Sequence, residues 1–326
     1  MDDEIKVTIY CVAYNHEKYI RDTLEGFVNQ KTNFKYEVLI NDDASTDNTA
    51  AIIREYEEKY PDLIIPFYQT ENQYSKGNGD CKYIFNKFFE KVTRGKYVAY
   101  CEGDDYWCDE NKLQLQYDML ESGKGYVASV HQTKRIQCIT GEESDYSVCE
   151  GDTLDLETIL MHWGNAGHMS SLMTTKEYYL ERPEFTELLA GDFGIFIYIA
   201  LTGSVSYINN TMSVYREYSG ATSWSNKNQT GSERLKQLYD IRMKEMDAFE
   251  KADEYSGRKY HKIFEKAKAD RYFAALDYKF NKKLLFDKYQ KMILKQKSAK
   301  ERRAILMNTY FPRLFKTLVG VKNRKR

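Results

Sequence analysis

The sequence lacks several features that would identify common classes of protein. No apolar run approaches the roughly 20 residues that a membrane-spanning helix needs, and the longest, 193–201, is interrupted by Gly194. The patterns GxGxxG, GxxxxGK[ST], HExxH and GxSxG are all missing. A dehydrogenase, a P-loop kinase, a zincin and a serine hydrolase are therefore poorly supported.

Export and redox signals are also missing. The six cysteines form no CxxC pair, which argues against a zinc ribbon or a dithiol redox motif. The first residues, MDDEIKVTIY, are acidic where a secretory signal would be basic and then apolar. We therefore expect reduced thiols and a cytoplasmic protein.

What the sequence does contain is enough apolar material for a folded core, with 42% hydrophobic and 30% charged residues. Its net charge of −1 conceals an asymmetry, because residues 282–326 hold 15 Lys or Arg against Asp287 and Glu301. We expect this basic tail to meet an anionic membrane surface, the alternative being a solvated helical face that closes the fold. Nucleic acid is not expected, since no reading motif accompanies the tail.

Strand and helix patterns alternate along the first two-thirds of the chain. Strands are predicted at 5–12, 36–41, 63–69 and 96–102, with helical stretches between them. This alternation predicts an α/β fold with a mostly parallel sheet flanked by helices. From 231 to 306 the chain has no proline and is rich in Lys, Glu, Leu and Ala, so we expect residues 1–225 to form one domain and 226–326 a helical, basic C-terminal extension.

Two acidic pairs stand at the ends of predicted strands. Asp42 and Asp43 follow the second strand, and Asp104 and Asp105 follow the fourth. Ligands of parallel α/β sheets bind beyond the carboxyl ends of the strands, so both pairs are expected in one crevice. Adjacent carboxylates there need a compensating charge, and Mg²⁺ or Mn²⁺ suits such oxygen ligands. A turn with solvated aspartates is the alternative.

Three sequence blocks, in order and on these elements, carry a family resemblance. They are Ala13-Tyr14-Asn15, the segment 41–47 (NDDASTD) and the segment 102–105 (EGDD). Together they resemble the motifs of family-2 glycosyltransferases over roughly residues 5–225. The resemblance implies the GT-A fold and inverting, metal-dependent transfer from a nucleotide-diphosphate sugar, with a UDP-sugar favoured.

The resemblance also implies roles for residues near the donor. Val12 and Tyr14 would line the base pocket, and Asp43 would hydrogen-bond the nucleobase or ribose. Asp104 would lie by the ribose and donor sugar, and Asp105 would be the chief protein ligand of the metal. A core aromatic is the alternative for Tyr14.

On the acceptor side, the resemblance makes Asp192 the base that deprotonates the acceptor hydroxyl. A carboxylate just before an apolar helical run is partly desolvated and more basic, and an N-cap is the plain alternative. His168 and Trp107 are expected on the acceptor side, although a structural histidine is the alternative for His168. Arg216 would help to hold the diphosphate, or would form a surface ion pair.

The chain departs from the family pattern at Glu102, Gly191 and Tyr218. Relatives commonly carry Glu at the position of Gly191 and, in many cases, His at that of Tyr218. These departures keep a second hypothesis open, a catalytically weakened nucleotide-sugar-binding scaffold. A third hypothesis is a nucleotidyltransferase, which would use a similar carboxylate–metal site but release pyrophosphate. The main hypothesis is an enzyme of cell-surface polysaccharide or glycolipid assembly. It would act on a saccharide or lipid-linked saccharide acceptor, at the inner face of the membrane as a peripheral protein.

Overall fold

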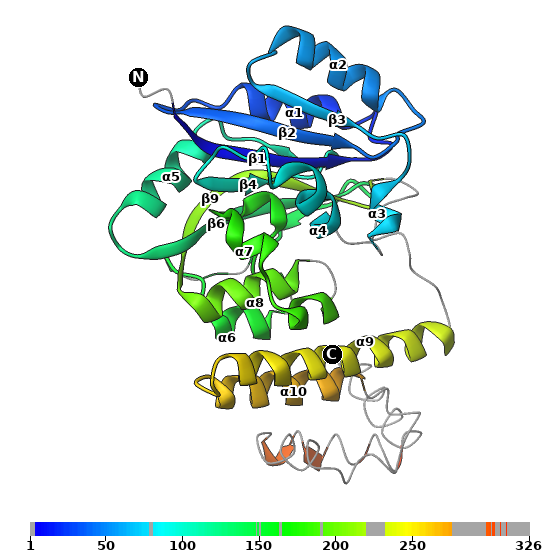
Figure 1. Cartoon of the computed structure of the whole chain (residues 1–326). Coiled ribbons are helices and arrows are strands. Elements are labelled where there is room, and N and C mark those ends of the chain that lie inside the picture. Colours follow the sequence, from blue (N-terminus) through cyan, green and yellow to red (C-terminus); the bar gives the residue numbers. More distant parts are fainter. Residues whose placement is uncertain are drawn as a thin grey trace. The chain divides into compact units, whose positions relative to one another are not determined.

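A computed structural model describes residues 4–77, 81–147, 149, 151–162, 165–189, 192–219 and 232–275, with isolated positions between 298 and 311 (Figure 1). The chain divides into two compact units. The first comprises residues 1–186 and 191–227, and the second comprises 187–190 and 228–326.

The first four strands of unit 1 form a parallel sheet in the order β3-β2-β1-β4. They are β1 (Ile5–Ala13), β2 (Lys35–Asp42), β3 (Ile64–Tyr68) and β4 (Tyr97–Tyr100). All four predicted strands are present, with their carboxyl ends at one edge of the sheet. The sheet therefore places both acidic pairs at that edge.

Beyond β4 the sheet becomes mixed, where the sequence had predicted a mostly parallel one. The order continues β8-β6-β9-β5, and β7 pairs with β6. Only β6 and β9 are parallel in this half, because short antiparallel strands join the remaining neighbours. The strands are β5 (Tyr106–Trp107), β6 (Tyr126–Gln137), β7 (Glu143–Asp145), β8 (Met173–Thr175) and β9 (Ser204–Glu217).

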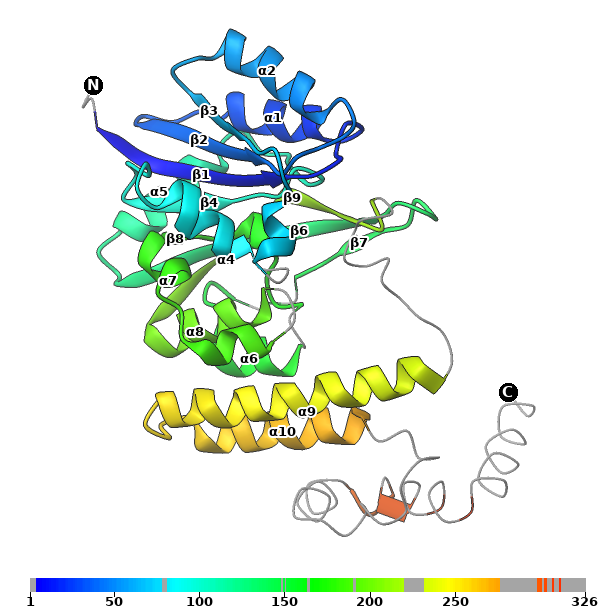
Figure 2. The ribbon, with the colours of Figure 1, turned by 45° about the vertical axis from the view of Figure 1, so that its right-hand side comes forward.

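Helices α1 (Ile20–Val28) and α2 (Thr49–Lys59) cover one face of the parallel strands (Figure 2). The helical spacing of Ile20, Leu24 and Phe27 gives α1 one apolar face, and all three side chains are fully buried. They share a core with the alternate residues of β1, because successive strand residues point to opposite faces. These β1 residues are Val7, Ile9, Cys11 and Ala13.

The opposite face of β1 is covered by an aromatic segment. Tyr10 packs against Phe85 and Phe89, each with its ring centroid 5.0 Å from that of Tyr10. These phenylalanines begin and end a π-helix, Phe85–Phe89, that directly follows the short helix α4 (Cys81–Ile84). Figures 1 and 2 show α4 on the side of the sheet opposite α1 and α2.

The other helical segments of the chain up to residue 202 are short, and six of the ten residues of the apolar α8 are buried. A Cβ at Gly194 would lie 2.4 Å from the carbonyl oxygen of Thr186, so only glycine allows this approach of α8 to the preceding loop. The helices are α3 (Gln73–Lys76), α5 (Lys112–Glu121), α6 (Leu156–Met161), α7 (Lys176–Leu180) and α8 (Phe193–Thr202), with 3₁₀ turns at Met169–Ser171 and Glu184–Leu188.

In the second unit, α9 (Ser232–Tyr255) and α10 (His261–Ala275) pack against each other. Phe249 and Phe264 meet between them with ring centroids 6.2 Å apart. No described helix is long and apolar enough to cross a membrane. Phe311 of the basic tail is exposed, and most of the tail predicted to meet a membrane lies outside the described residues.

Candidate active site

Three carboxylates gather immediately after β4. Ligand oxygens of Glu102, Asp104 and Asp105 all lie within 4.8 Å of one another. Glu102 is exposed, Asp104 is partly buried and Asp105 is only 1% exposed. The acidic turn thus runs from the solvent into the protein interior.

The turn has this shape because Gly103 is clamped between β1 and α1. Its N–H donates to the carbonyl of Val12 at 2.9 Å. The Thr23 hydroxyl lies 3.1 Å from the Gly103 carbonyl and 2.5 Å from that of Asp105. A Cβ at Gly103 would lie 2.9 Å from the Ala13 Cβ, so the space admits glycine alone.

Asp105 is held through one oxygen only. Its Oδ1 accepts the backbone N–H of Arg216 at 2.8 Å. Its Oδ2 is buried and has no hydrogen-bond partner among the described residues. Burial, together with the charges of Asp104 and Glu102, raises the pKa of Asp105 well above its usual value.

The other two carboxylates are more accessible. Asp104 Oδ2 accepts a hydrogen bond from the Ser219 hydroxyl at 2.7 Å and lies 3.9 Å from Nε2 of His16. Part of the Glu102 side chain is exposed, and desolvation of its carboxyl group by the surrounding protein, with the charges of Asp104 and Asp192, raises its pKa to about 8. Because ionising one carboxylate discourages its neighbours from ionising, the cluster favours either a bound proton or a cation.

The guanidinium of Arg216, a residue of β9, contacts the acidic turn. It donates to the backbone carbonyl of Asp104 at 2.9 Å and pairs with Asp22 of α1. It also lies over the rings of Tyr19 and Tyr106, at 4.9 and 4.4 Å from their centroids. With only 11% of its side chain exposed, Arg216 is no simple surface ion pair, and its contact with a diphosphate stays a prediction.

The second acidic pair is joined to the same end of β1. The N–H of Asp43 donates to the Ala13 carbonyl at 2.8 Å, one residue beyond the carbonyl that holds the acidic turn. The Asp43 carboxylate accepts the backbone N–H groups of Gln73 and Tyr74, at 2.6 and 3.0 Å. The structure therefore brings both acidic blocks together at β1, while the nucleotide contacts of Asp43 stay a prediction.

Val12 and Tyr14 also lie at this end of β1, both partly buried. The loop that follows Tyr14 is tied to the DDASTD segment, because Asn15 accepts the N–H of Thr46 at 2.8 Å and donates its own N–H to Ser45 at 2.9 Å. Asn15 has a φ of 57°, a left-handed conformation that asparagine adopts more readily than most residues. The tyrosine-asparagine turn thus fixes the edge of the predicted base pocket.

Asp192 lies at the N-terminal end of α8. It occupies the N-cap position, yet its side chain makes no capping hydrogen bond to the helix, so the plain N-cap alternative does not explain it. Its charge contributes to the raised pKa values of Glu102 and Tyr146. The charge of Asp192 therefore acts on Glu102, although 90 residues separate the two along the chain.

His168 lies next to Asp105 and is buried. Its Nε2 is 3.8 Å from Asp105 Oδ2, and desolvation lowers its pKa to about 4. Its ring packs in a tilted arrangement against that of Tyr215 and meets the ring of Tyr146 edge-on. No local sequence pattern pointed to Tyr146, because only the folding of β7 against β6 brings it here.

Trp107 lies in the hydrophobic core, whereas the sequence analysis expected it on the acceptor side. It is 3% exposed, its indole N–H donates to the Ser170 carbonyl at 3.0 Å, and its ring packs edge-on against Phe27. The ammonium of Lys112 lies 3.9 Å from the ring centroid. With its N–H satisfied and its ring enclosed, Trp107 is a core residue.

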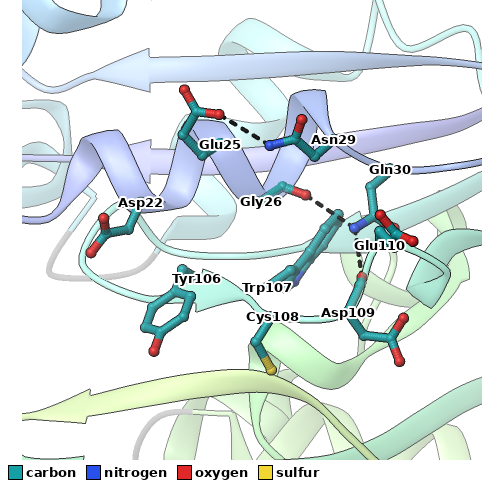
Figure 3. Close-up of a pocket in the computed structure, with 10 residues that line it drawn as sticks. All are labelled: Asp22, Glu25, Gly26, Asn29, Gln30, Tyr106, Trp107, Cys108, Asp109 and Glu110. Atoms are coloured by element: carbon teal, nitrogen blue, oxygen red, sulfur yellow. Dashed lines mark hydrogen bonds between the residues drawn. The ribbon is translucent and has the colours of Figure 1, made fainter.

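A shallow pocket of about 430 Å³ lies between α1 and the segment that follows the acidic turn (Figure 3). Asp22 and Tyr106 lie at one end of it, and Gln30 bridges the carbonyls of Gly26 and Asp109 at 3.0 and 2.8 Å. None of the three clustered carboxylates lines this pocket. It is therefore distinct from the candidate active site.

The cluster suits a divalent cation. Carboxylate oxygens are the ligands that Mg²⁺ and Mn²⁺ prefer, and three are within 4.8 Å of one another. The buried, unpartnered Oδ2 of Asp105 is an uncompensated acceptor that a cation would satisfy. The residues present therefore fit the metal that the sequence predicted.

This sheet, with its acidic turn beyond β4, has the GT-A fold of nucleotide-diphospho-sugar transferases. Among solved structures, Staphylococcus aureus TarS 1–349 in complex with UDP-GlcNAc superposes with a TM-score of 0.57, at 15% identity, covering 93% of this chain and 87% of that one. Residues 8–147 match the sequence model of glycosyl transferase family 2. Over these residues the chain is similar to that family.

Two relatives illustrate the range of similarity. An uncharacterised protein of Mycobacterium tuberculosis is 31% identical over 217 residues, which are 65% of this chain and 59% of that protein. The UDP-Glc:alpha-D-GlcNAc-diphosphoundecaprenol beta-1,3-glucosyltransferase WfaP of Escherichia coli is 31% identical over 122 residues, 37% of this chain and 44% of that enzyme. The chain thus spans about three-fifths of the length of the mycobacterial relative.

Proposed function

We propose that the protein is an inverting, metal-dependent glycosyltransferase that moves a sugar from a nucleotide-diphosphate donor to a hydroxyl acceptor. The observation that carries this proposal is the gathering of Glu102, Asp104 and Asp105 at one end of the sheet, where the charge of Asp192 also acts on Glu102. A UDP-sugar is favoured as donor, because the TarS complex holds UDP-GlcNAc and the E. coli relative is named for UDP-Glc.

The three clustered carboxylates would hold Mg²⁺ or Mn²⁺, with Asp105 as the chief ligand. When bound, the cation stabilises negative charge on the departing diphosphate. Asp104 would lie by the ribose and donor sugar, and Val12, Tyr14 and Asp43 would line the nucleotide site. Arg216 positions the turn through its backbone N–H on Asp105.

Asp192 acts as the general base. Its carboxylate takes the proton of the acceptor hydroxyl while that oxygen attacks the anomeric carbon. The bond between the anomeric carbon and the diphosphate oxygen breaks on the opposite face, and its electron pair leaves with the nucleoside diphosphate. A single displacement of this kind inverts the anomeric configuration, which NMR of the product's anomeric proton reports.

The acceptor is a saccharide or a lipid-linked saccharide of cell-surface polysaccharide or glycolipid assembly. The E. coli relative supports this class, since its name specifies a diphosphoundecaprenol-linked acceptor. In this proposal residues 1–225 form the transferase domain, and the basic extension, 226–326, docks on the anionic inner face of the membrane. Deleting 310–326 should reduce sedimentation with phosphatidylglycerol vesicles, and unchanged sedimentation would refute the docking.

Replacing the base tests the chemistry. Asp192→Asn should lower transfer by about 10²–10⁴-fold, the usual contribution of a general base, while the thermal shift produced by a nucleotide sugar with Mn²⁺ is retained. Asp118→Asn, an exposed aspartate on α5, is the matched control and should be unaffected. Near-normal transfer by Asp192→Asn would disprove the base assignment.

The weakened-scaffold alternative makes a different prediction for the wild-type protein. A scaffold would show the nucleotide-sugar thermal shift but neither transfer nor slow donor hydrolysis with Mn²⁺. A transferase shows both binding and donor hydrolysis. A nucleotidyltransferase would instead release pyrophosphate, which a phosphatase-coupled assay detects.

A further inference from the structure

The carboxylate of Asp105 is asymmetric in its surroundings. Oδ1 is fixed by the N–H of Arg216 at 2.8 Å, whereas Oδ2 is buried without a hydrogen-bond partner in the described part of the chain. A buried acceptor left in this way costs free energy. The polar group that faces Oδ2 is the imidazole of His168, whose Nε2 lies 3.8 Å away.

The hydrogen bonds of His168 determine which ring nitrogen carries the proton. Its Nδ1 accepts the backbone N–H of Ser170 at 3.2 Å. A backbone N–H can only donate, so this contact needs a lone pair on Nδ1 and places the proton of the neutral ring on Nε2. The Ser170 hydroxyl lies closer to Nδ1, at 2.8 Å, and is compatible with the same tautomer when it donates to Nδ1. His168 therefore directs an N–H donor toward the unpartnered oxygen of Asp105.

The ring is also fixed in orientation. It packs against Tyr215 in a tilted arrangement, with ring centroids 4.4 Å apart and an interplanar angle of 30°, and Tyr146 meets it edge-on at 5.1 Å. The preceding residue, Gly167, leaves no room for a Cβ, which would lie 2.8 Å from the ring of Phe196. A donor whose tautomer and ring plane are both set in advance is suited to orienting another side chain.

We propose that His168 is a positioning residue for Asp105, with its Nε2–H orienting Oδ2 toward the cation. The separation of 3.8 Å is longer than a hydrogen bond, and contacts of this kind tighten when an active site is filled. This inference rests on the metal site of the proposed function, and it gives His168 a role toward the metal ligand instead of the acceptor. Losing an outer partner of a metal ligand typically weakens metal binding by about 10–100-fold.

Mn²⁺ binding to the full-length, nucleotide-free protein tests this role, with free Mn²⁺ measured by electron paramagnetic resonance. His168→Ala should weaken binding by about 10–100-fold. His168→Gln should recover part of the affinity, because its side-chain amide supplies an N–H donor. His162→Ala is the matched control, since His162 is exposed on the surface of the same unit. A purely structural histidine would show no such recovery.

Asp105→Asn separates failure of this inference from failure of the proposed function. If Asp105→Asn abolishes Mn²⁺ binding while His168→Ala stays within two-fold of wild type, only the role of His168 is overturned. If the wild type binds no Mn²⁺, or Asp105→Asn binds it normally, the metal site itself is overturned. Should His168→Ala fail to fold, long-range ¹H–¹⁵N spectra of the wild type decide: an Nε2–H tautomer supports the role and an Nδ1–H tautomer refutes it.

Discussion

Asp105→Asn is predicted to stabilise the metal-free protein while removing its response to a divalent cation. Asparagine is nearly the same size and keeps an oxygen that can accept the Arg216 N–H, a bond of 2.8 Å in the wild type. What the substitution removes is one of three carboxylates gathered within 4.8 Å. Stability and cation binding should therefore change in opposite directions.

The magnitude follows from this spacing. At an effective dielectric constant of about 20, two unit charges at 4.8 Å or closer repel each other by about 3 kcal/mol or more. In a domain of this size, each kcal/mol shifts the melting temperature by about 2–4 °C. A gain of about 3 kcal/mol would thus raise the melting temperature by about 6–12 °C.

The stability advantage of Asp105→Asn over the wild type should increase with pH. Burial and the neighbouring carboxylates raise the pKa of Asp105 in the folded state, so the folded protein retains a proton that the unfolded chain releases near pH 4. Wild-type stability is therefore fully present below the unfolded pKa and falls as the pH rises toward the folded pKa. The asparagine variant has no such proton, and its advantage should grow from pH 4 to pH 8.

Thermal unfolding in EDTA at pH 4.5, 6 and 8 measures the stability gain and its pH dependence. Repeating the measurement at pH 8 with Mn²⁺ instead of EDTA tests the loss of cation binding. Asp62→Asn is the control, because Asp62 is exposed and outside the cluster. We expect Asp105→Asn to match the wild type at pH 4.5, to exceed it at pH 8, and to gain nothing from Mn²⁺. Lower stability than wild type at pH 8 in EDTA, or a wild-type Mn²⁺ shift, would refute the reasoning.

Three further substitutions test the acidic turn, the buried Lys112 and Arg216. Gly103→Ala places a Cβ 2.9 Å from Nδ1 of His16. It should therefore lower the free energy of unfolding in urea by about 1–3 kcal/mol and weaken Mn²⁺ binding. Wild-type stability together with wild-type Mn²⁺ affinity would contradict the close packing of Gly103 between β1 and α1. Burial lowers the pKa of Lys112 from 10.5 to about 7. Between these two pH values the unfolded state binds more protons than the folded state, so wild-type stability rises with pH over this range. Lys112→Met should remove that slope and stabilise the protein at pH 7 by about 1–4 kcal/mol, and a persisting slope would rule out the assignment. Arg216→Lys loses the planar contact with Tyr106 and should lower the free energy of unfolding by about 1–3 kcal/mol, whereas unchanged denaturation would show that the stacking contributes little.

Much of the parallel half of the sheet was predictable because local patterns agree with the fold. The apolar strand 5–12 and the helical spacing of Ile20, Leu24 and Phe27 predicted β1 and α1, whose residues share one core. The acidic pairs were placed at strand ends by the same reasoning. The N–H groups of Gly103, which precedes one pair, and of Asp43, in the other pair, donate to consecutive carbonyls of β1, those of Val12 and Ala13.

The second half of the sheet was less predictable, because its pairings join short strands over long sequence separations. β8 has three residues and β5 two, too few for a periodic pattern to show. The antiparallel pairings of β8 with β4 and β6 therefore gave no sequence signal. Trp107 was misassigned for the same reason, since its position after the acidic turn did not reveal the core that encloses it.

The sequence by itself determined the residue types of the site and the end of the sheet where they stand, because apolar periodicity fixes where a strand stops and the carboxylates follow at once. Only the tertiary structure decided how each carboxylate is used. The N–H of Arg216 lies 111 residues from Asp105 along the chain, and His168 and Asp192 arrive from still other elements. Such contacts depend on strand order and packing, which no local pattern encodes.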